Sequence, residues 1–171
     1  MKQMIWAAAF AVAATMPSAG LAQDFGAAFS GFNTGSDQPI QIEADRLEVR
    51  DPEKLAVYIG NVKVRQGDTI LEAAELRVFY AGEATAGGAP GSSVSRIEAG
   101  PKVVVHSNDQ TASGDSAILD MAKDLITLTG NVVLTSGPNV VRGNRLVVNL
   151  KTKQGRMEGG RVQTLITPSG G

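Results

Sequence analysis

The chain has 171 residues, with 16 Lys and Arg, 17 Asp and Glu, one His and no Cys, and its formal net charge at pH 7 is −1. The lack of cysteine excludes disulfide scaffolds, thiolate-bound zinc, iron–sulfur clusters and thiol catalysis, and a single histidine excludes metal sites built on several imidazoles. The balanced charge argues against nucleic-acid binding, which requires a marked basic excess. We therefore expect no cofactor, no metal and no nucleic-acid partner.

Residues 1–22 have the pattern of a cleavable signal peptide. Lys2 precedes an apolar run over residues 4–15, and the small residues Gly20 and Ala22 occupy positions −3 and −1 of a signal-peptidase site, so we expect cleavage after Ala22. The alternative is an uncleaved membrane anchor, which is disfavoured because the run has about 12 residues and ~20 are needed to span a bilayer. Export without cysteines points to a bacterial periplasm.

The rest of the chain predicts an all-β protein with one domain over residues 38–168. Residues 23–37 are rich in Gly, Ser and Ala, which predicts a flexible N-terminal arm, while 169–171 form a short tail. The domain consists of short runs of Val, Ile, Leu and Tyr that often alternate with polar residues. The composition of residues 81–95 predicts a loop. Residues 71–80 are the best candidate for a helix, but their alternation favours a strand.

The domain contains an internal repeat. Residues 42–80 align without a gap with residues 112–150, at an offset of 70 positions. Among the identical pairs are Asp45 and Asp115, Gly60 and Gly130, and Asn61 and Asn131. Such self-similarity predicts units that stack on one another, as in a β-solenoid or a long, repetitive jelly roll. The alternative is an ordinary β-sandwich with a chance similarity.

A shorter pattern recurs 29 residues later within each unit and reads apolar, polar, small, polar, polar, apolar, polar, apolar. The small residue and the polar pair after it suit a tight corner, and the last three residues begin a strand. The small residues of the four predicted corners are Ala44, Ala73, Gly114 and Gly143.

Stacked strands of this kind predict an aliphatic interior and two free ends. Residues 38–171 contain only three aromatic residues, so the interior is either tightly packed or leaves a groove for an apolar ligand. The terminal strands, over 40–49 and 161–167, contain no proline that would block pairing with another chain. The residues expected to face the interior are Ile40, Ile42, Leu47, Val49, Val57, Val62, Val64, Ile70, Leu76, Val78, Val103, Val105, Leu119, Leu128, Leu134 and Val148.

The sequence offers little catalytic chemistry. His106 follows an apolar run and has no nucleophile or metal-ligand spacing around it, so we expect a surface or hydrogen-bonded sheet residue. Asp45 and Asp115 could form the acid pair of an inverting glycosidase. Because they occupy equivalent repeat positions, we expect both to hydrogen-bond the local backbone at a turn. A basic C-terminal part suggests either a solvated face or contact with phosphate groups: Arg142, Arg145, Lys151, Lys153, Arg156 and Arg161.

Five segments resemble the LptA/OstA family of periplasmic lipopolysaccharide-transport proteins. They are DQPIQIEAD (37–45), GNVKVRQG (60–67), AKDLITLTGNVVL (122–134), VVRGNRLVV (140–148) and RVQTLITP (161–168). They keep their order over both repeat units and cover nearly the whole domain. The resemblance implies a twisted, open-ended β-jelly roll of sixteen stacked antiparallel strands, lined with apolar residues.

The resemblance also implies a non-enzymatic periplasmic carrier that shields the acyl chains of lipid A. The interior residues named above would line its lipid groove. Copies would associate head to tail, and the chain would bridge an inner-membrane-anchored partner and the amino-terminal domain of an outer-membrane translocon. Docking would use Ile40, Gln41 and Ile42 at one edge and Val162, Thr164 and Ile166 at the other. The alternatives are a secreted β-helical enzyme that acts on polysaccharides, or the membrane-anchored partner of the same transport system.

Overall fold

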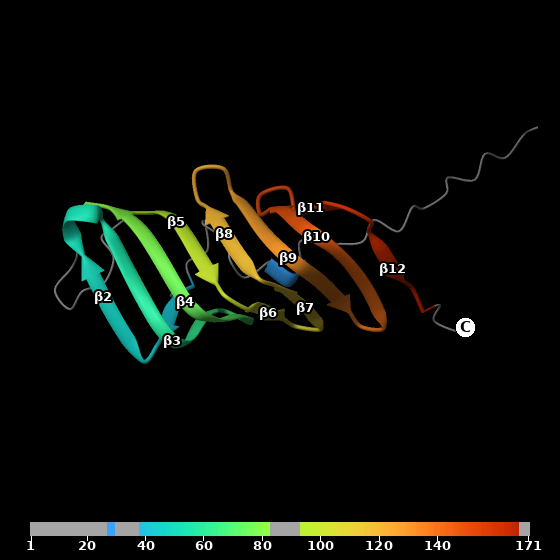
Figure 1. The fold of residues 1–171 in the computed structure, drawn as a ribbon, viewed down its shortest axis with the longest axis horizontal. Helices are drawn as coiled ribbons and strands as arrows, with labels where there is room; N and C mark the ends of the chain where they lie inside the picture. The colour runs from blue at the N-terminus through green and yellow to red at the C-terminus, as the bar shows by residue number, and fades with distance from the viewer. Residues whose placement is uncertain (1–26, 30–37, 83–92, 168–171) are drawn as a thin grey trace, which may run out of the picture.

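The computed structural model describes residues 27–29, 38–82 and 93–167. The predicted signal peptide (1–22) and tail (169–171) lie outside these residues, as do most of the predicted arm (23–37) and the centre of the predicted loop (81–95). The strands are stacked along the long axis of the molecule, with β2 near one end and β12 near the other (Figure 1).

The all-β prediction is confirmed, because the described chain consists of twelve antiparallel strands and two short 3-10 helices. The 3-10 helices are η1 (Ala27–Phe29) and η2 (Asp51–Glu53). The first six strands are β1 (Gln41–Glu43), β2 (Arg46–Arg50), β3 (Leu55–Gln66), β4 (Thr69–Ala81), β5 (Ser93–Gly100) and β6 (Val103–Ser107). The other six are β7 (Gln110–Gly114), β8 (Ser116–Asp120), β9 (Leu125–Ser136), β10 (Asn139–Asn149), β11 (Gln154–Glu158) and β12 (Gln163–Leu165).

Two segments test the expectations drawn from local sequence, and one of them differs. Residues 71–80 lie in β4, as their alternation predicted. β5 begins at Ser93, so residues 93–95, which were predicted to be loop, are strand; Ser93 and Val94 pair with Ala81 and Tyr80 at the end of β4.

The four long strands β3, β4, β9 and β10 are bent, and this divides the sheet into two layers. The register between β3 and β4 shifts from Ile59 to Val62, and that between β9 and β10 shifts at Gly143–Arg145. Each half of a long strand then pairs with a different neighbour. Layer 1 contains β2, β5, β8, β11 and residues 55–59, 75–81, 125–129 and 145–149. Layer 2 contains β1, β6, β7, β12 and residues 62–66, 69–73, 132–136 and 139–143.

Each layer therefore has eight strand segments, and the described residues supply sixteen in all, as the family resemblance implied. Residues directly opposite one another in antiparallel strands point to the same side of the sheet. The buried side chains of both layers form one hydrophobic cluster, which lies between the layers. The predicted jelly roll is thus confirmed.

The corners where the chain passes between layers are built alike in the two repeat units. Asn61 Nδ2 donates to Asp45 Oδ2 at 2.9 Å, and Asn131 Nδ2 donates to Asp115 Oδ2 at 3.0 Å. Gly60 and Gly130 precede these asparagines with φ of 82° and 81°. The prediction that both aspartates form hydrogen bonds at a corner of the chain is right. Their carboxylates, however, bind an asparagine of the paired neighbouring strand, β3 or β9, rather than the local backbone, because the bulge in that strand brings its side chain to the corner.

Candidate functional site

The space between the two layers is the first candidate site, and it is lined by aliphatic side chains. Nine of the residues predicted to face inward do so and are buried: Val62, Val64, Leu76, Val78, Val103, Val105, Leu128, Leu134 and Val148. Ile42 and Leu119 also point inward and are partly buried against the same cluster. Side chains therefore fill the interior in this structure.

Leu47 and Val49 of β2 lie at the rim of this interior. They stand opposite Tyr58 and Ala56, which are core residues, so their side chains point inward. They nevertheless remain 39% and 37% exposed, because β2 is the last strand of layer 1 and nothing packs beyond it in the described chain. The inner face of layer 1 is thus apolar up to its open end.

Two of the predicted interior residues lie on the outer face. Ile70 is directly opposite Arg65 and His106, both of which are exposed. Val57 stands between Glu48 and Arg77 in one row across three strands, and it is 4% exposed. The stems of long charged side chains can bury a valine in this way without placing it in the interior. Both inward predictions are therefore wrong.

Phe29 is the interior residue that sequence reasoning missed most clearly. It belongs to η1, which contacts β6 and β7, and it is 1% exposed, while Ala28 is fully buried. Both residues belong to the segment predicted to be a flexible arm. The spaced phenylalanines of that segment are the signal that could have indicated burial. Other unpredicted core residues include Tyr58, Tyr80, Ile126, Val132, Val141 and Leu146.

The two edges of the molecule are the second candidate site. Within residues 38–82 and 93–167, the exposed large hydrophobic residues all lie in or beside the end strands: Ile40, Leu47, Val49, Val162, Leu165 and Ile166. We call β1 and β2 the N-terminal edge, and β11 and β12 the C-terminal edge. Every residue from 161 to 167 is exposed, and β12 pairs only with β10. The predicted docking residues Ile40, Gln41, Ile42, Val162, Thr164 and Ile166 thus lie at these two edges.

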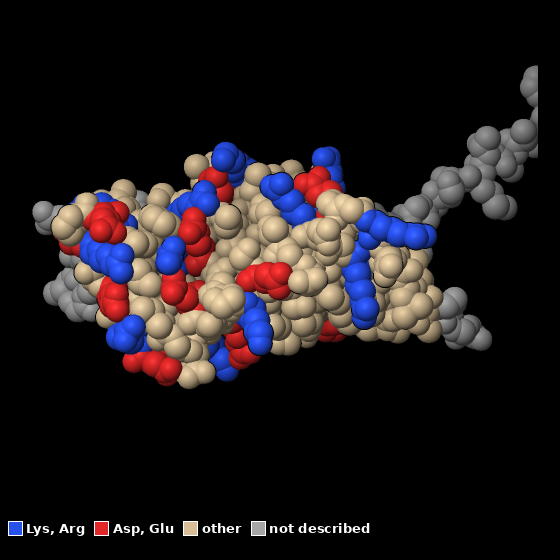
Figure 2. Space-filling model, in the orientation of Figure 1, with Lys and Arg blue, Asp and Glu red and all other residues tan. Residues whose placement is uncertain are grey.

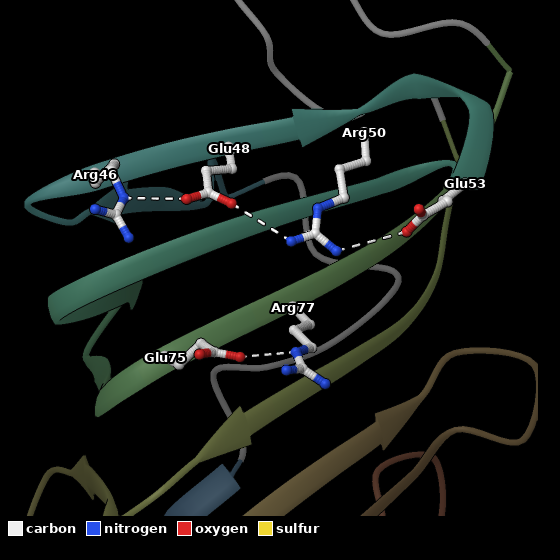
Figure 3. A network of polar contacts seen from close by, with 6 residues as sticks. All are labelled: Arg46, Glu48, Arg50, Glu53, Glu75 and Arg77. Carbon is white, nitrogen blue, oxygen red and sulfur yellow. Dashed lines mark hydrogen bonds and ion pairs between the residues drawn. The ribbon is translucent and has the colours of Figure 1, made fainter.

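Charge differs between the edges. At the N-terminal edge, Glu48 on β2 bridges Arg46 at 3.2 Å and Arg50 at 3.5 Å (Figure 3). Residues 40–54 hold five carboxylates and three cationic side chains, whereas residues 142–167 hold one carboxylate and six cationic side chains. In Figure 2, both signs alternate over β2–β5, and blue predominates toward the right-hand end. Exposed ion pairs such as those of Glu48 with Arg46 and Arg50 contribute little stability, about 0–1 kcal/mol each.

Several titratable groups of the described residues have specific partners or shifted pKa values. His106 Nδ1 is hydrogen-bonded with Thr111 Oγ1 at 3.0 Å on the outer face. A hydrogen bond from Lys123 lowers the pKa of Asp120, and burial raises the pKa of Tyr80, helped by the charge of Asp51. Nowhere in the described ranges do three or more His, Cys, Asp or Glu side chains gather so as to hold a metal ion. In the same ranges, no helix has the length and apolar character needed to cross a membrane.

Comparison with known proteins identifies relatives of the whole domain. Residues 41–154 match the model of the family described as LptA/(LptD N-terminal domain) LPS transport protein. An uncharacterised protein of Rhizobium meliloti (strain 1021) is 42% identical over 162 residues, which are 91% of this chain and 86% of that protein. The lipopolysaccharide export system protein LptA of Escherichia coli (strain K12) is 27% identical over 141 residues, covering 78% and 74% of the two chains.

A solved structure supports the fold. The crystal structure of LptH, the LptA-homologous periplasmic component of the lipopolysaccharide transport device of Pseudomonas aeruginosa, superposes with a TM-score of 0.61. The two sequences are 18% identical, and the match covers 77% of this chain and 96% of that one.

Proposed function

Because the chain belongs to the LptA/LptD N-terminal domain family of lipopolysaccharide transport proteins, we propose that it carries lipopolysaccharide with the acyl chains of lipid A between its two layers. One observation carries the proposal: an aliphatic interior continues from the core to the rim residues Leu47 and Val49, where it opens at the edge. Burial of a 12-carbon chain would contribute up to about 10 kcal/mol, at ~0.8 kcal/mol per methylene. The family favours a carrier over the polysaccharide-acting enzyme considered from the sequence.

The packed interior implies that lipid entry needs rearrangement. An acyl chain that enters the space next to β6 and β7 meets Phe29, which occupies it in this structure. The lipid would therefore displace η1 or separate the layers. η1 is the smaller element, and β6 and β7 are its main neighbours among the described strands, so its displacement is the smaller rearrangement.

A charge at the rim tests whether acyl chains bind in the interior. Val49→Asp is expected to weaken lipopolysaccharide binding about tenfold or more, because a carboxylate at the open end has to lose water when a lipid chain passes it. The side chain is partly exposed already, so the fold should tolerate the change. The measurement is saturation binding of lipopolysaccharide to the purified protein.

The matched control for Val49→Asp is Val147→Asp. Val147 stands opposite Arg156 and Thr127 on the outer face of layer 1, so the same substitution there does not touch the interior. Binding should remain as in the unmodified protein. Equal losses in the two variants, or unchanged binding in Val49→Asp, would argue against a lipid site between the layers.

We further propose that the edges dock to neighbouring chains by strand pairing. Such pairing would join copies of this chain head to tail and link them to an inner-membrane-anchored partner and the amino-terminal domain of an outer-membrane translocon, with the protein in the periplasm. Free strand edges pair readily unless proline or inward-pointing charge blocks them, and neither is present in β12. The excess of cations in residues 142–167, which lie in and next to the C-terminal edge, and of carboxylates in residues 40–54 supports a head-to-tail orientation.

Proline in β12 is expected to abolish self-association. Successive amides of a strand point to opposite sides, so one of Thr164 and Leu165 directs its N–H away from β10. Either Thr164→Pro or Leu165→Pro therefore removes a donor at the free edge. Sedimentation velocity should show the loss of oligomers in that variant.

Salt provides an independent control on the same edges. If opposite charges orient the docking, association of the unmodified chain should weaken between low ionic strength and about 0.5 M salt, where screening is strong. Oligomers that persist in both proline variants and at all salt concentrations would rule out pairing through β12.

A further inference from the structure

The inner face of layer 2 carries a continuous row of polar side chains. In the strand register, Gln66 stands opposite Thr69, Thr69 opposite Ser107, and Ser107 opposite Gln110. Gln110 then stands opposite Ser136, and Ser136 opposite Asn139. One polar residue thus comes from each of six neighbouring segments, all next to the turns that join the strands of this layer. We call these six residues the polar row.

Beside the polar row lies an aliphatic row with the same direction. Two residues farther from the turn on each segment, the register aligns Val64, Leu71, Val105, Ala112, Leu134 and Val141. Five of these six are buried, and Leu71 packs partly buried against the same cluster. On each of these six segments, the inner face of layer 2 therefore changes from polar to apolar over two residues. An amphiphile has the same arrangement, with a polar head followed by an apolar chain.

The hydrogen bonds within the row leave one acceptor without a partner. Thr69 Oγ1 and Ser107 Oγ are bonded at 3.0 Å, and both residues are almost fully buried. At the two ends, Gln66 Nε2 donates to the carbonyl of Gln38, and Asn139 Oδ1 accepts from the backbone N–H of Thr167. In the middle of the row, Gln110 Oε1 is buried and has no hydrogen-bond partner in the described chain. A buried unsatisfied acceptor is costly, so it is rare in folded proteins.

We propose that the polar row, centred on Gln110, binds hydrogen-bond donors on the acyl part of the cargo, namely hydroxyl or amide N–H groups close to the head of the chain. This inference rests on the proposed function. A carbonyl oxygen accepts only, so its partner is an O–H or N–H. None of the six residues is charged, so the row offers no cation that would offset the burial of a phosphate. The methylenes of the same chain would lie on the adjacent aliphatic row.

The geometry of the row also suits movement of the cargo. Neighbouring strands lie ~4.8 Å apart, so six segments present hydrogen-bonding groups over about 24 Å along the stacking direction. A donor that leaves one residue of the row meets the next without passing an apolar gap. The row would therefore fix which side of the lipid faces the turns, while it allows the lipid to shift from strand to strand.

Two fatty acids that differ by one hydroxyl group test the inference. The probes are 3-hydroxytetradecanoic acid and tetradecanoic acid, titrated by calorimetry into the full chain. The unmodified protein is expected to bind the hydroxylated acid about 2-fold to 10-fold more tightly, as one hydrogen bond to a buried acceptor provides. Gln110→Leu is expected to remove or reverse this preference, because it leaves the hydroxyl without a partner, and to bind tetradecanoic acid at least as well.

The control is Thr111→Val, which removes a polar group from the neighbouring residue on the outer face. It should keep the preference. If Gln110→Leu does not fold, Gln110→Met preserves the length of the side chain and gives the same readout. Equal binding of the two acids by the unmodified protein, or a preference that survives loss of Gln110, would show that water satisfies this acceptor and overturn the inference alone. If neither acid nor lipopolysaccharide binds, the proposed function fails as well.

Discussion

Alanine in place of Gly60 is expected to lower the free energy of unfolding by about 2–5 kcal/mol, measured by chemical denaturation. Gly60 has φ of 82°, where a residue with a Cβ is strained by ~1–2 kcal/mol. The added Cβ would also overlap the carboxylate of Asp45, which adds a packing cost of about 1–3 kcal/mol. Gly130 has the same φ and the same relation to Asp115 in the second repeat unit, so Gly130→Ala should cost a similar amount.

The control for this effect is Gly67→Ala. Gly67 also has positive φ, 56°, but a Cβ there would meet no atom within 4 Å. Its replacement should therefore cost only about 1 kcal/mol, from the backbone alone. Asp45→Ala combined with Gly60→Ala should recover part of the loss, since it removes the overlapping carboxylate. Equal losses at Gly60 and Gly67 would show that the corner contact adds nothing to backbone strain.

These corners show how far the sequence predicts the fold. The repeat located four of them through Ala44, Ala73, Gly114 and Gly143, and the structure places each where the chain passes between layers. The partner of each aspartate was not predictable, because the Gly-Asn pair reads locally as a chain reversal. In the structure it is a bulge within a long strand, and only the pairing of β3 with β4 and of β9 with β10 reveals that.

The register shift at Ala74 in β4 explains one of the two errors in the predicted interior. In β4 the inward residues before the corner are Thr69, Leu71 and Ala73, and those after it are Leu76, Val78 and Tyr80. An alternation counted back from Leu76 therefore assigns Ile70 to the wrong face, since an extra residue reverses the faces of a strand. Val57 lies in a run that is apolar throughout, where alternation carries no signal.

The polar row escaped prediction for a related reason. Polar residues at strand ends ordinarily face solvent or belong to turns, and Gln66, Ser107 and Gln110 each precede or follow a turn. Their inward direction follows only from the register that pairs them with one another. Phe29 was missed because its neighbours lack any hydrophobic period, so nothing local ties it to β6 or β7.

The replacement Leu128→Ala is expected to cost about 2–5 kcal/mol of unfolding free energy in the absence of lipid. Leu128 is fully buried and stands between Ala117 and Leu146 on the inner face of layer 1. Removal of its side chain loses the transfer free energy and leaves a cavity. An apolar cavity of this kind binds apolar ligands. With saturating lipopolysaccharide, an acyl chain can fill the space, so the loss should become smaller.

A comparison with Gly60→Ala separates the filling of the cavity by lipid from general stabilisation by a ligand. Any ligand that binds only the folded chain raises its stability by mass action, and that increase applies to every variant with unchanged affinity. Gly60→Ala lies at a corner outside the interior, so its cost should be the same with and without lipid. The cost of Leu128→Ala should be smaller with lipid than without it, because in this variant the lipid replaces contacts that the substitution removed. Thermal unfolding of both variants, each with and without lipopolysaccharide, measures this difference; equal costs of Leu128→Ala in the two conditions would place the lipid elsewhere than between the layers.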